Sequence, residues 1–308
     1  MKGLDLSETF YNEHGSRMIA DQFDSYADRI AVGLVGPGSE CFGFDDDISR
    51  DHDWGPDFCM WLTSEDFKIV GQDFQSAYNK LPKTFMGFGP RRVSPGEQGR
   101  TGAIEIKAFY RTYTGLDHMP KDPLEWLRIP EQALATCTNG KIFSDPLGKF
   151  TRWREELLKF YPEDIRLKKI ASRCITAAQA GQYNFERSVK RKDYFATRYS
   201  ESVFCADIIS LVFLLNKRYT PFYKWMHHAL KELPIVGETI HRRITDLIEE
   251  EDNRNKSNII EKICAEIIRE LKAQGITDSN SNFLLDHAQS IHSRIKDPAF
   301  GKRLSVIN

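Results

Sequence analysis

Residues 36–54 read GPGSECFGFDDDISRDHDW: a glycine-serine turn, then five aspartates crowded between positions 45 and 53. Carboxylates this close repel one another unless a cation or basic groups offset their charge. A divalent metal is the simplest offset, because Mg²⁺ takes oxygen ligands from one or two carboxylates together with phosphates. We therefore expect the active site in this stretch.

The segments around this stretch predict a small β-sheet with a helix. Ile30–Val35 is β-branched and reads as a strand that runs into the turn, which then opens a short helical segment. Phe58–Leu62 is an apolar run and predicts a buried strand. Ser64–Lys80 begins with a serine cap and acids and predicts a helix. Ala103–Tyr110 predicts a further strand.

The remainder of the first half predicts loops and short elements. Phe85–Gly99 is rich in Gly, Pro and Arg and reads as a loop. Asp122–Leu134 predicts a short helix broken by Pro130. Asn139-Gly140 is a turn dipeptide that suits a hairpin. The turn at 145–148 is the expected domain boundary.

The second half predicts helices almost throughout. The expected helical segments are 152–160, 164–181, 184–193, 200–217, 220–232 and 257–274. We therefore expect an α+β chain, with a small mixed sheet and flanking helices in residues 1–149 and an all-α bundle in residues 150–308. The acidic run 249–252 is expected to be a solvated helix face or a turn between domains.

Composition narrows the function classes. The 308 residues carry a net charge of −1, which argues against a surface that binds nucleic acid as a whole. The six cysteines form no CxxC pair, so a zinc site is not expected, and their spread favours a reducing, cytoplasmic setting. The most apolar segment, Val203–Leu215, contains Asp207 and is too short to span a membrane, so it predicts a buried helix.

The residues of the first half suggest a phosphate-handling layout. Gly38 and Ser39 would offer backbone N–H groups and a hydroxyl to a triphosphate. Asp51 and Asp53 are two apart, so on an extended strand both would point to one face and could share two metal ions. Glu105 is flanked by isoleucines, where an unpaired charge would be costly, and it is the expected third carboxylate.

Gly38-Ser39, Asp51-x-Asp53 and Ile104-Glu105-Ile106 resemble the pattern of the nucleotidyltransferase superfamily of the DNA polymerase beta type. The longer runs 38–56 and 215–225 resemble an uncharacterised bacterial nucleotidyltransferase-like family. The resemblance implies transfer of a nucleoside monophosphate from an NTP, with release of pyrophosphate. ATP is the expected NTP. It also implies that Asp51, Asp53 and Glu105 bind Mg²⁺. Glu105 can in addition act as the general base.

Aminoglycoside nucleotidyltransferases share the plan of such a domain followed by a helical bundle. Two clusters in the second half are therefore candidates for ligand contacts. Lys217 and Lys224 are expected to offset triphosphate charge. Gln182, Asn184 and Arg187 are suited to hydrogen bonding and are expected to contact the acceptor, a small hydroxylated molecule or a tRNA or protein.

Each of these assignments has a structural alternative. An Asp-x-Asp pair can be a loop or a structural calcium-like site, and Glu105 can form an ion pair with Arg92 or Lys107. Lys217 can simply complement a helix C-terminus. His52 is expected to be structural or to support a metal ligand. Asp45–Asp47 are expected to be turn residues and acids that support the site, and one of them could bind the acceptor. The rival function is a nucleotide-binding sensor or regulatory module that no longer turns over.

Overall fold

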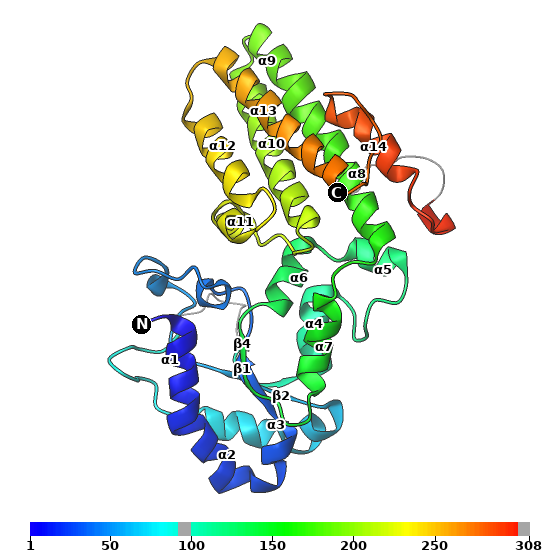
Figure 1. Cartoon of the computed structure of the whole chain (residues 1–308). Helices are drawn as coiled ribbons and strands as arrows, with labels where there is room; N and C mark the ends of the chain where they lie inside the picture. Colours follow the sequence, from blue (N-terminus) through cyan, green and yellow to red (C-terminus); the bar gives the residue numbers. More distant parts are fainter. Residues whose placement is uncertain (92–99, 301–308) are drawn as a thin grey trace. The chain divides into compact units, whose positions relative to one another are not determined.

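The computed structural model describes residues 1–91 and 100–300 (Figure 1). The chain divides into two compact units. The sheet unit comprises Met1–Lys121 and Ala133–Lys159, and the helical unit comprises Asp122–Gln132 and Phe160–Asn308. The predicted boundary after residue 149 differs from this division at two places, because residues 150–159 belong to the sheet unit and residues 122–132 to the helical unit.

A four-stranded mixed sheet forms the centre of the sheet unit. Its strands are β1 (Ala31–Leu34), β2 (Cys59–Leu62), β3 (Gly102–Glu105) and β4 (Lys141–Ser144), in the order β3-β2-β1-β4. β1 is antiparallel to both β2 and β4, whereas β3 runs parallel to β2. The predicted strands at 30–35 and 58–62 are confirmed, and so is the α+β class.

Successive side chains of β2 point to opposite faces of the sheet. Those side chains are apolar, so helices cover both faces. Met60 and Leu62 join a core cluster with α1 and α3, whereas Trp61 stacks on Phe150 with ring centroids 3.8 Å apart. The helices of this unit are α1 (Gly3–Phe10), α2 (Ser16–Phe23), α3 (Ser64–Tyr78), α4 (Ile106–Thr114), α7 (Lys149–Leu158) and most of α6 (Glu131–Thr138).

Two expectations for this unit are wrong. The strand predicted over 103–110 ends at Glu105, and α4 begins at Ile106. Phe109 and Tyr110 are buried on that helix against Phe150, so tertiary packing overrides the strand-like composition. Asn139-Gly140 does not close a hairpin, because it joins α6 to β4.

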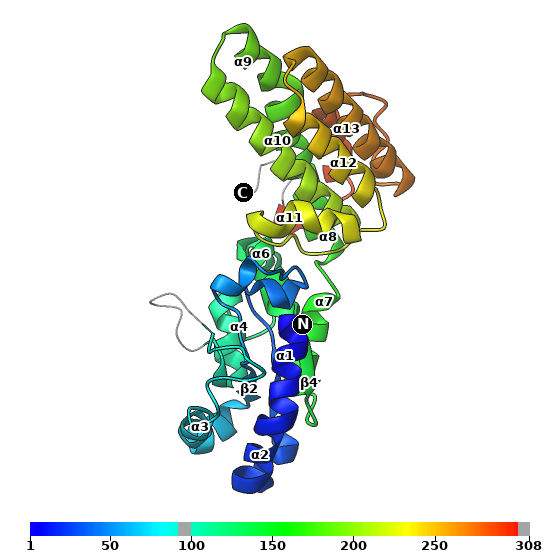
Figure 2. The same ribbon diagram turned by 90° about the vertical axis from the view of Figure 1, so that its left-hand side faces the viewer.

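The helical unit is all-α, as predicted. Its helices are α5 (Pro123–Arg128), α8 (Glu163–Ala177), α9 (Glu186–Lys190), α10 (Tyr194–Leu215), α11 (Tyr223–Ala229), α12 (Gly237–Glu249), α13 (Asn253–Ala273) and α14 (Leu284–His292). A π-helical segment, Ala178–Phe185, joins α8 to α9. Helices α10, α12 and α13 lie side by side (Figures 1 and 2).

The buried helix predicted around Val203–Leu215 is confirmed as the C-terminal half of α10. Nearly every residue of α10 from Phe204 onward is buried, including the polar side chains of Asp207 and Ser210. Within residues 1–91 and 100–300, no helix combines the length and the apolar character needed to cross a membrane. The acidic run 249–252 begins at Glu249, the last residue of α12, and ends at Asp252, whose side chain caps the N-terminus of α13.

The turn at Gly140 gives a stability test. Gly140 has φ +64°, and a Cβ there would lie 2.0 Å from the Leu34 carbonyl oxygen. We expect Gly140→Ala to lower the free energy of unfolding by about 1–2 kcal/mol, because alanine is strained in the left-handed backbone conformation. Overpacking should lower it by roughly 1–3 kcal/mol more. Gly115→Ala is the matched control, because Gly115 has φ +75° and open space around it. Denaturant unfolding measures both; equal losses would contradict the predicted clash.

Candidate functional site

The strand register decides which of the predicted site residues share an edge of the sheet. Gly33 pairs with Cys59, and Cys59 pairs with Gly102. β1 therefore ends where β2 and β3 begin. We call this the Gly-Ser edge, because the turn after β1, the segment before β2 and the segment before β3 all adjoin it.

The glycine-serine turn is fixed by a side chain from far along the chain. Asn139 Oδ1 accepts a hydrogen bond from the Gly36 N–H at 3.1 Å, and Asn139 Nδ2 donates to the Gly36 carbonyl at 2.7 Å. The turn then opens a short 3₁₀ helix, Ser39–Phe42, which confirms the predicted helical segment. Asn139 thus holds both polar groups of Gly36.

Asp51 and Asp53 do not lie on a strand, so the expectation that they share a strand face is wrong. Asp51 ends a 3₁₀ turn and is exposed. Asp53 has φ +54° and is buried, with 8% of its surface exposed. β2 begins only at Cys59, after Gly55 and Pro56. A Cβ at Gly55 would lie 2.8 Å from the backbone nitrogen of Arg91, so the close approach of the two backbone segments requires a glycine there.

Arg91 is the centre of a buried charge cluster at the Gly-Ser edge. Its Nη1 donates to Glu40 Oε1 at 2.7 Å, to the Asp53 carbonyl at 2.7 Å and to Asp53 Oδ1 at 3.1 Å. Its Nε lies 3.7 Å from Asp57 Oδ2, and Arg100 Nη2 lies 2.5 Å from Asp53 Oδ2. We call these five residues the Arg91 cluster.

The five residues of the Arg91 cluster set three carboxylates against two guanidinium groups, and Lys83 adds a positive charge near Asp57. Burial raises the pKa of Glu40 despite the nearby Arg91, and burial likewise raises the pKa of Asp57. Burial alone would lower the pKa of Arg91, but Glu40, Asp53 and Asp57 outweigh it and raise that pKa. Glu40 Oε2 is buried and has no hydrogen-bond partner in the described part of the chain.

The glycine-serine turn itself lies against this negative charge. A Cβ at Gly38 would lie 2.4 Å from Glu40 Oε2, so the carboxylate occupies the space beside the turn. A phosphate at Gly38 and Ser39 would therefore meet Glu40 as well as the backbone. Arg91 is the group that offsets Glu40 at this point.

The other three aspartates of the segment have structural roles. Asp45 is buried and accepts hydrogen bonds from the Gly3 N–H at 2.7 Å and from Trp54 Nε1 at 3.1 Å, which ties α1 to this segment. Asp46 accepts from the N–H groups of the turn that follows it. Asp47 is exposed and pairs with Arg50. The expectation of turn residues fits Asp46 best.

The structure does not bring Glu105 to the Gly-Ser edge. Glu105 is the last residue of β3 and pairs with Leu62, the last residue of β2. It lies three positions after Gly102, or about 10 Å along the strand, and it accepts a hydrogen bond from the Ser64 hydroxyl. Arg92, one of its two expected ion-pair partners, lies outside the described residues.

The expected three-carboxylate metal site is consequently not assembled. In residues 1–91 and 100–300, no group of three or more His, Cys, Asp or Glu side chains is placed to hold a metal ion. Sequence reasoning missed Glu40, Arg91 and Arg100. The Arg-rich loop was visible in the sequence, but no local pattern indicates which carboxylates its arginines meet.

The predicted ligand residues of the helical unit fall in two groups, one at residues 182–187 and one at Lys217 and Lys224. Gln182 has a structural role, because it hydrogen-bonds Glu261, the Asn282 carbonyl and the Leu284 N–H. The Arg187 guanidinium lies 4.8 Å from the ring centroid of Tyr183. The remaining three, Asn184, Lys217 and Lys224, are exposed.

Comparison with known proteins gives limited information. A family model described as a domain of unknown function (DUF4037) matches residues 126–226. A solved nucleotidyltransferase-like protein from Exiguobacterium sibiricum has 11% identity and a TM-score of 0.38, over 84% of this chain and 75% of that chain. A TM-score this low does not establish a shared fold. A comparison with curated proteins found no match.

The Arg91 cluster gives a second stability test. Arg91→Met leaves Glu40, Asp53 and Asp57 without their shared guanidinium, and breaking a buried ion pair in this way costs about 3–5 kcal/mol at neutral pH. Without Arg91 the pKa of Glu40 in the folded state rises further above its unfolded value. Above about pH 4.3 the folded variant then binds more protons than its unfolded state. The loss of unfolding free energy caused by Arg91→Met should therefore be smaller at pH 5 than at pH 8.

The exposed Arg111 supplies the control, because Arg111→Met removes the same charge at the surface. Guanidinium chloride unfolding at both pH values measures the difference. A small loss for Arg91→Met at pH 8, or a loss that grows on acidification, would contradict the predicted role.

Proposed function

We propose that this chain is a magnesium-dependent nucleotidyltransferase that moves a nucleoside monophosphate from an NTP to an acceptor hydroxyl and releases pyrophosphate. The observation that carries the proposal is the meeting of two segments at the Gly-Ser edge. The turn with Gly38 and Ser39 follows β1, and the segment with Asp51 and Asp53 leads into β2. The order of these segments matches the sequence resemblance described above.

In this proposal a cation offsets the carboxylates at this edge. The Arg91 cluster contains three carboxylates and two guanidinium groups, and Glu40 Oε2 is buried without a partner. Asp51 and Asp53 would hold Mg²⁺ together with phosphate oxygens, which are its usual ligands in such sites. When bound, the ion would neutralise charge that develops on the transferring phosphoryl group.

The protein's own groups bind and orient the nucleotide in this proposal. The guanidinium groups of Arg91 and Arg100 occupy both carboxylate oxygens of Asp53. An incoming triphosphate offers these guanidinium groups charge-assisted hydrogen bonds of its own. In this proposal Arg100 then contacts a phosphate in place of Asp53, and the Asp53 carboxylate contacts a cation. Ser39 adds a hydroxyl donor at the turn.

We assign no metal contact to Glu105, because the strand register separates it from Asp53. The acceptor and the preferred NTP are not identified by these residues; ATP is the first nucleotide to test. Lys217 and Lys224 remain predicted nucleotide contacts, and Asn184 and Arg187 remain predicted acceptor contacts. All four are accessible in the helical unit.

A second candidate function is nucleotide binding without turnover, as in a sensor or regulatory module. The observation that favours it is the full engagement of Asp53 by Arg91 and Arg100. If the guanidinium groups stay in place when a nucleotide binds, they replace the metal and no transfer follows. Tight NTP binding without pyrophosphate release over any acceptor would select this function.

The transfer activity is tested by charge-removing variants of the same segment. We expect Asp51→Asn and Asp53→Asn each to lower Mg²⁺-dependent pyrophosphate release by roughly a hundredfold or more, because each loses a metal ligand. Asp47→Asn is the matched control, since it removes one exposed carboxylate from the same segment. The assay combines the full chain, Mg²⁺, labelled NTPs and a cell extract that supplies acceptors. Wild-type rates in either Asp51→Asn or Asp53→Asn would exclude the assignment.

Glu105 gives a separate test of how the site is built. We expect Glu105→Gln to keep pyrophosphate release within a few-fold of the wild type, because its partner is the Ser64 hydroxyl at the other end of β3. A glutamine can still accept that hydrogen bond. A loss as large as that of Asp53→Asn, with an unchanged unfolding midpoint, would instead place Glu105 in the catalytic machinery.

A further inference from the structure

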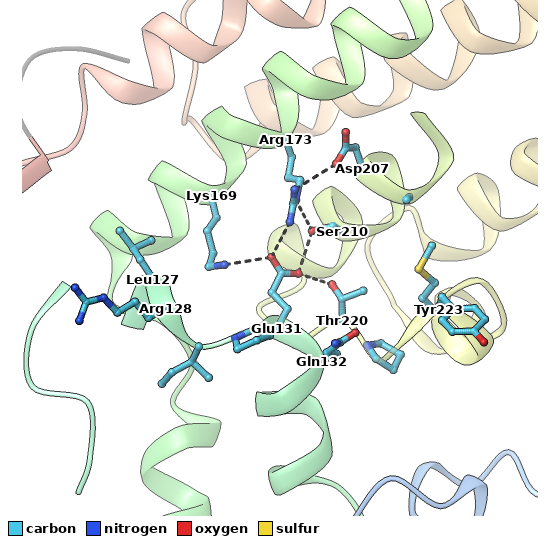
Figure 3. A pocket seen from close by; sticks show the side chains of 15 residues that line it. Leu127, Arg128, Glu131, Gln132, Lys169, Arg173, Asp207, Ser210, Thr220 and Tyr223 are labelled. Carbon is cyan, nitrogen blue, oxygen red and sulfur yellow. Dashed lines mark hydrogen bonds and ion pairs between the residues drawn. The ribbon is translucent and has the colours of Figure 1, made fainter. Parts of the chain in front are cut away.

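The helical unit contains a pocket whose lining carries more positive than negative charge. The pocket has a volume of about 500 Å³, and all of the residues that line it belong to the helical unit (Figure 3). They come from α5 and the start of α6, from α8 and α10, and from α11 with the segment that leads into it. The charged residues of the lining are Arg128, Lys169, Arg173, Glu131 and Asp207, so the cations exceed the carboxylates by one.

Glu131 is a fixed anion whose oxygens are engaged by the protein. Its Oε2 accepts hydrogen bonds from the hydroxyls of Ser210 at 3.0 Å and Thr220 at 2.7 Å. Its Oε1 lies 3.4 Å from Lys169 Nζ and 3.7 Å from Arg173 Nη2. Burial alone would raise the pKa of Glu131, but Lys169 and Arg173 outweigh it and lower that pKa.

Asp207, the other carboxylate of the lining, is also engaged by the protein. Its Oδ1 accepts a hydrogen bond from Arg173 Nη1 at 3.3 Å, and its Oδ2 is buried. Burial raises the pKa of Asp207, an effect that the Thr176 hydroxyl, outside the lining, and Arg173 partly offset. The pocket therefore offers its ligand few acceptors.

Lys169, by contrast, has donors to spare. Its ammonium group carries three N–H bonds, and its partners among the described residues are Glu131 Oε1 at 3.4 Å and the ring of Tyr161, whose centroid is 5.1 Å away. The Lys169 side chain is 7% exposed. Burial lowers the pKa of Lys169, and Glu131 offsets that effect only in part. A further anion beside this ammonium group would therefore stabilise its charged form.

The two arginines of the lining also keep N–H groups for a ligand. Arg173 Nη2 lies 3.7 Å from Glu131 Oε1, which is beyond hydrogen-bond distance. Arg128 is exposed and forms no ion pair or side-chain hydrogen bond within the described part of the chain. The unused polar capacity of the pocket thus consists mainly of cationic donors.

The rest of the pocket is mostly apolar. Ile129, Pro221 and Met226 line it, and Tyr223 adds an aromatic ring that is 76% exposed. Such a surface suits the hydrocarbon part of a ligand rather than a second charged group.

We propose that this pocket binds a small organic acid that carries one carboxylate on an apolar body. One carboxylate neutralises the single excess positive charge of the lining. A carboxylate only accepts hydrogen bonds, and charge-assisted bonds of this kind are strong. Lys169 Nζ and Arg173 Nη2 both lie within 3.7 Å of the same Glu131 oxygen, so one carboxylate can reach both donors (Figure 3). This inference concerns the helical unit alone and does not depend on the proposed transfer activity.

The test uses three probes that share a benzyl group and differ in charge. Phenylacetate is the anion, phenylacetamide is its uncharged isostere, and 2-phenylethylamine is the cation. Acetate lacks the apolar body, and phenyl phosphate carries a second negative charge near neutral pH. Binding to the full chain is followed by saturation-transfer NMR and by titration at millimolar concentrations. We expect phenylacetate to bind at least several-fold more tightly than each of the other four probes.

Two variants remove positive charge from the lining. Lys169→Met should weaken phenylacetate binding roughly ten- to a hundredfold, as expected for a lost hydrogen bond between charged groups. Arg128→Gln should weaken it roughly two- to fivefold, because an exposed charge contributes less. Arg191→Gln is the matched control, since Arg191 is an exposed arginine of the same unit outside the lining. Thermal unfolding checks that Lys169→Met remains folded, and Arg128→Gln provides the test if it does not.

Three results would overturn the proposal. One is equal or tighter binding of any of the other four probes, because the pocket would then not select a single carboxylate on an apolar body. Another is the absence of binding by every probe. The last is phenylacetate binding that is unchanged in a folded Lys169→Met variant, or that is equal in Arg128→Gln and Arg191→Gln, either of which would place the ligand elsewhere.

Discussion

The guanidinium of Arg91 is the group on which the Gly-Ser edge depends. It pairs with Glu40 and Asp53 and lies close to Asp57, and without it three largely buried carboxylates would face one another. Isolated charges of this kind cannot stay in a protein interior, because the loss of hydration exceeds any other stabilisation available to them. The arginine thus allows an acid-rich segment to fold against the end of the sheet.

The two units solve the same electrostatic problem with opposite signs. In the sheet unit a buried cation, Arg91, is surrounded by the carboxylates of Glu40, Asp53 and Asp57. In the helical unit a buried anion, Glu131, is surrounded by two cations, Lys169 and Arg173, and by the hydroxyls of Ser210 and Thr220. The proposed Mg²⁺ with its phosphates would offset the carboxylates of the first site.

Hydrogen bonds between distant parts of the chain position the first site. Asn139 holds Gly36 from more than a hundred residues away, and Asp45 ties α1 to the acidic segment through Gly3. The acidic stretch is therefore divided between two tasks. Asp45 and Asp46 maintain the local fold, and Asp53 belongs to the Arg91 cluster.

The sequence by itself determined the fold class, the strands at 31–34 and 59–62 and the run of helices in the second half, because these follow from local hydrophobic pattern and turn residues. It could not determine that Glu105 ends β3 away from Asp53, because strand register depends on pairing between distant segments. Nor could it show that Arg91 meets Glu40 or that Glu131 meets Thr220, 89 residues later. Only the tertiary structure decides such ion pairs and hydrogen bonds. A buried charge needs a partner, and the packing of distant segments decides which one lies near it.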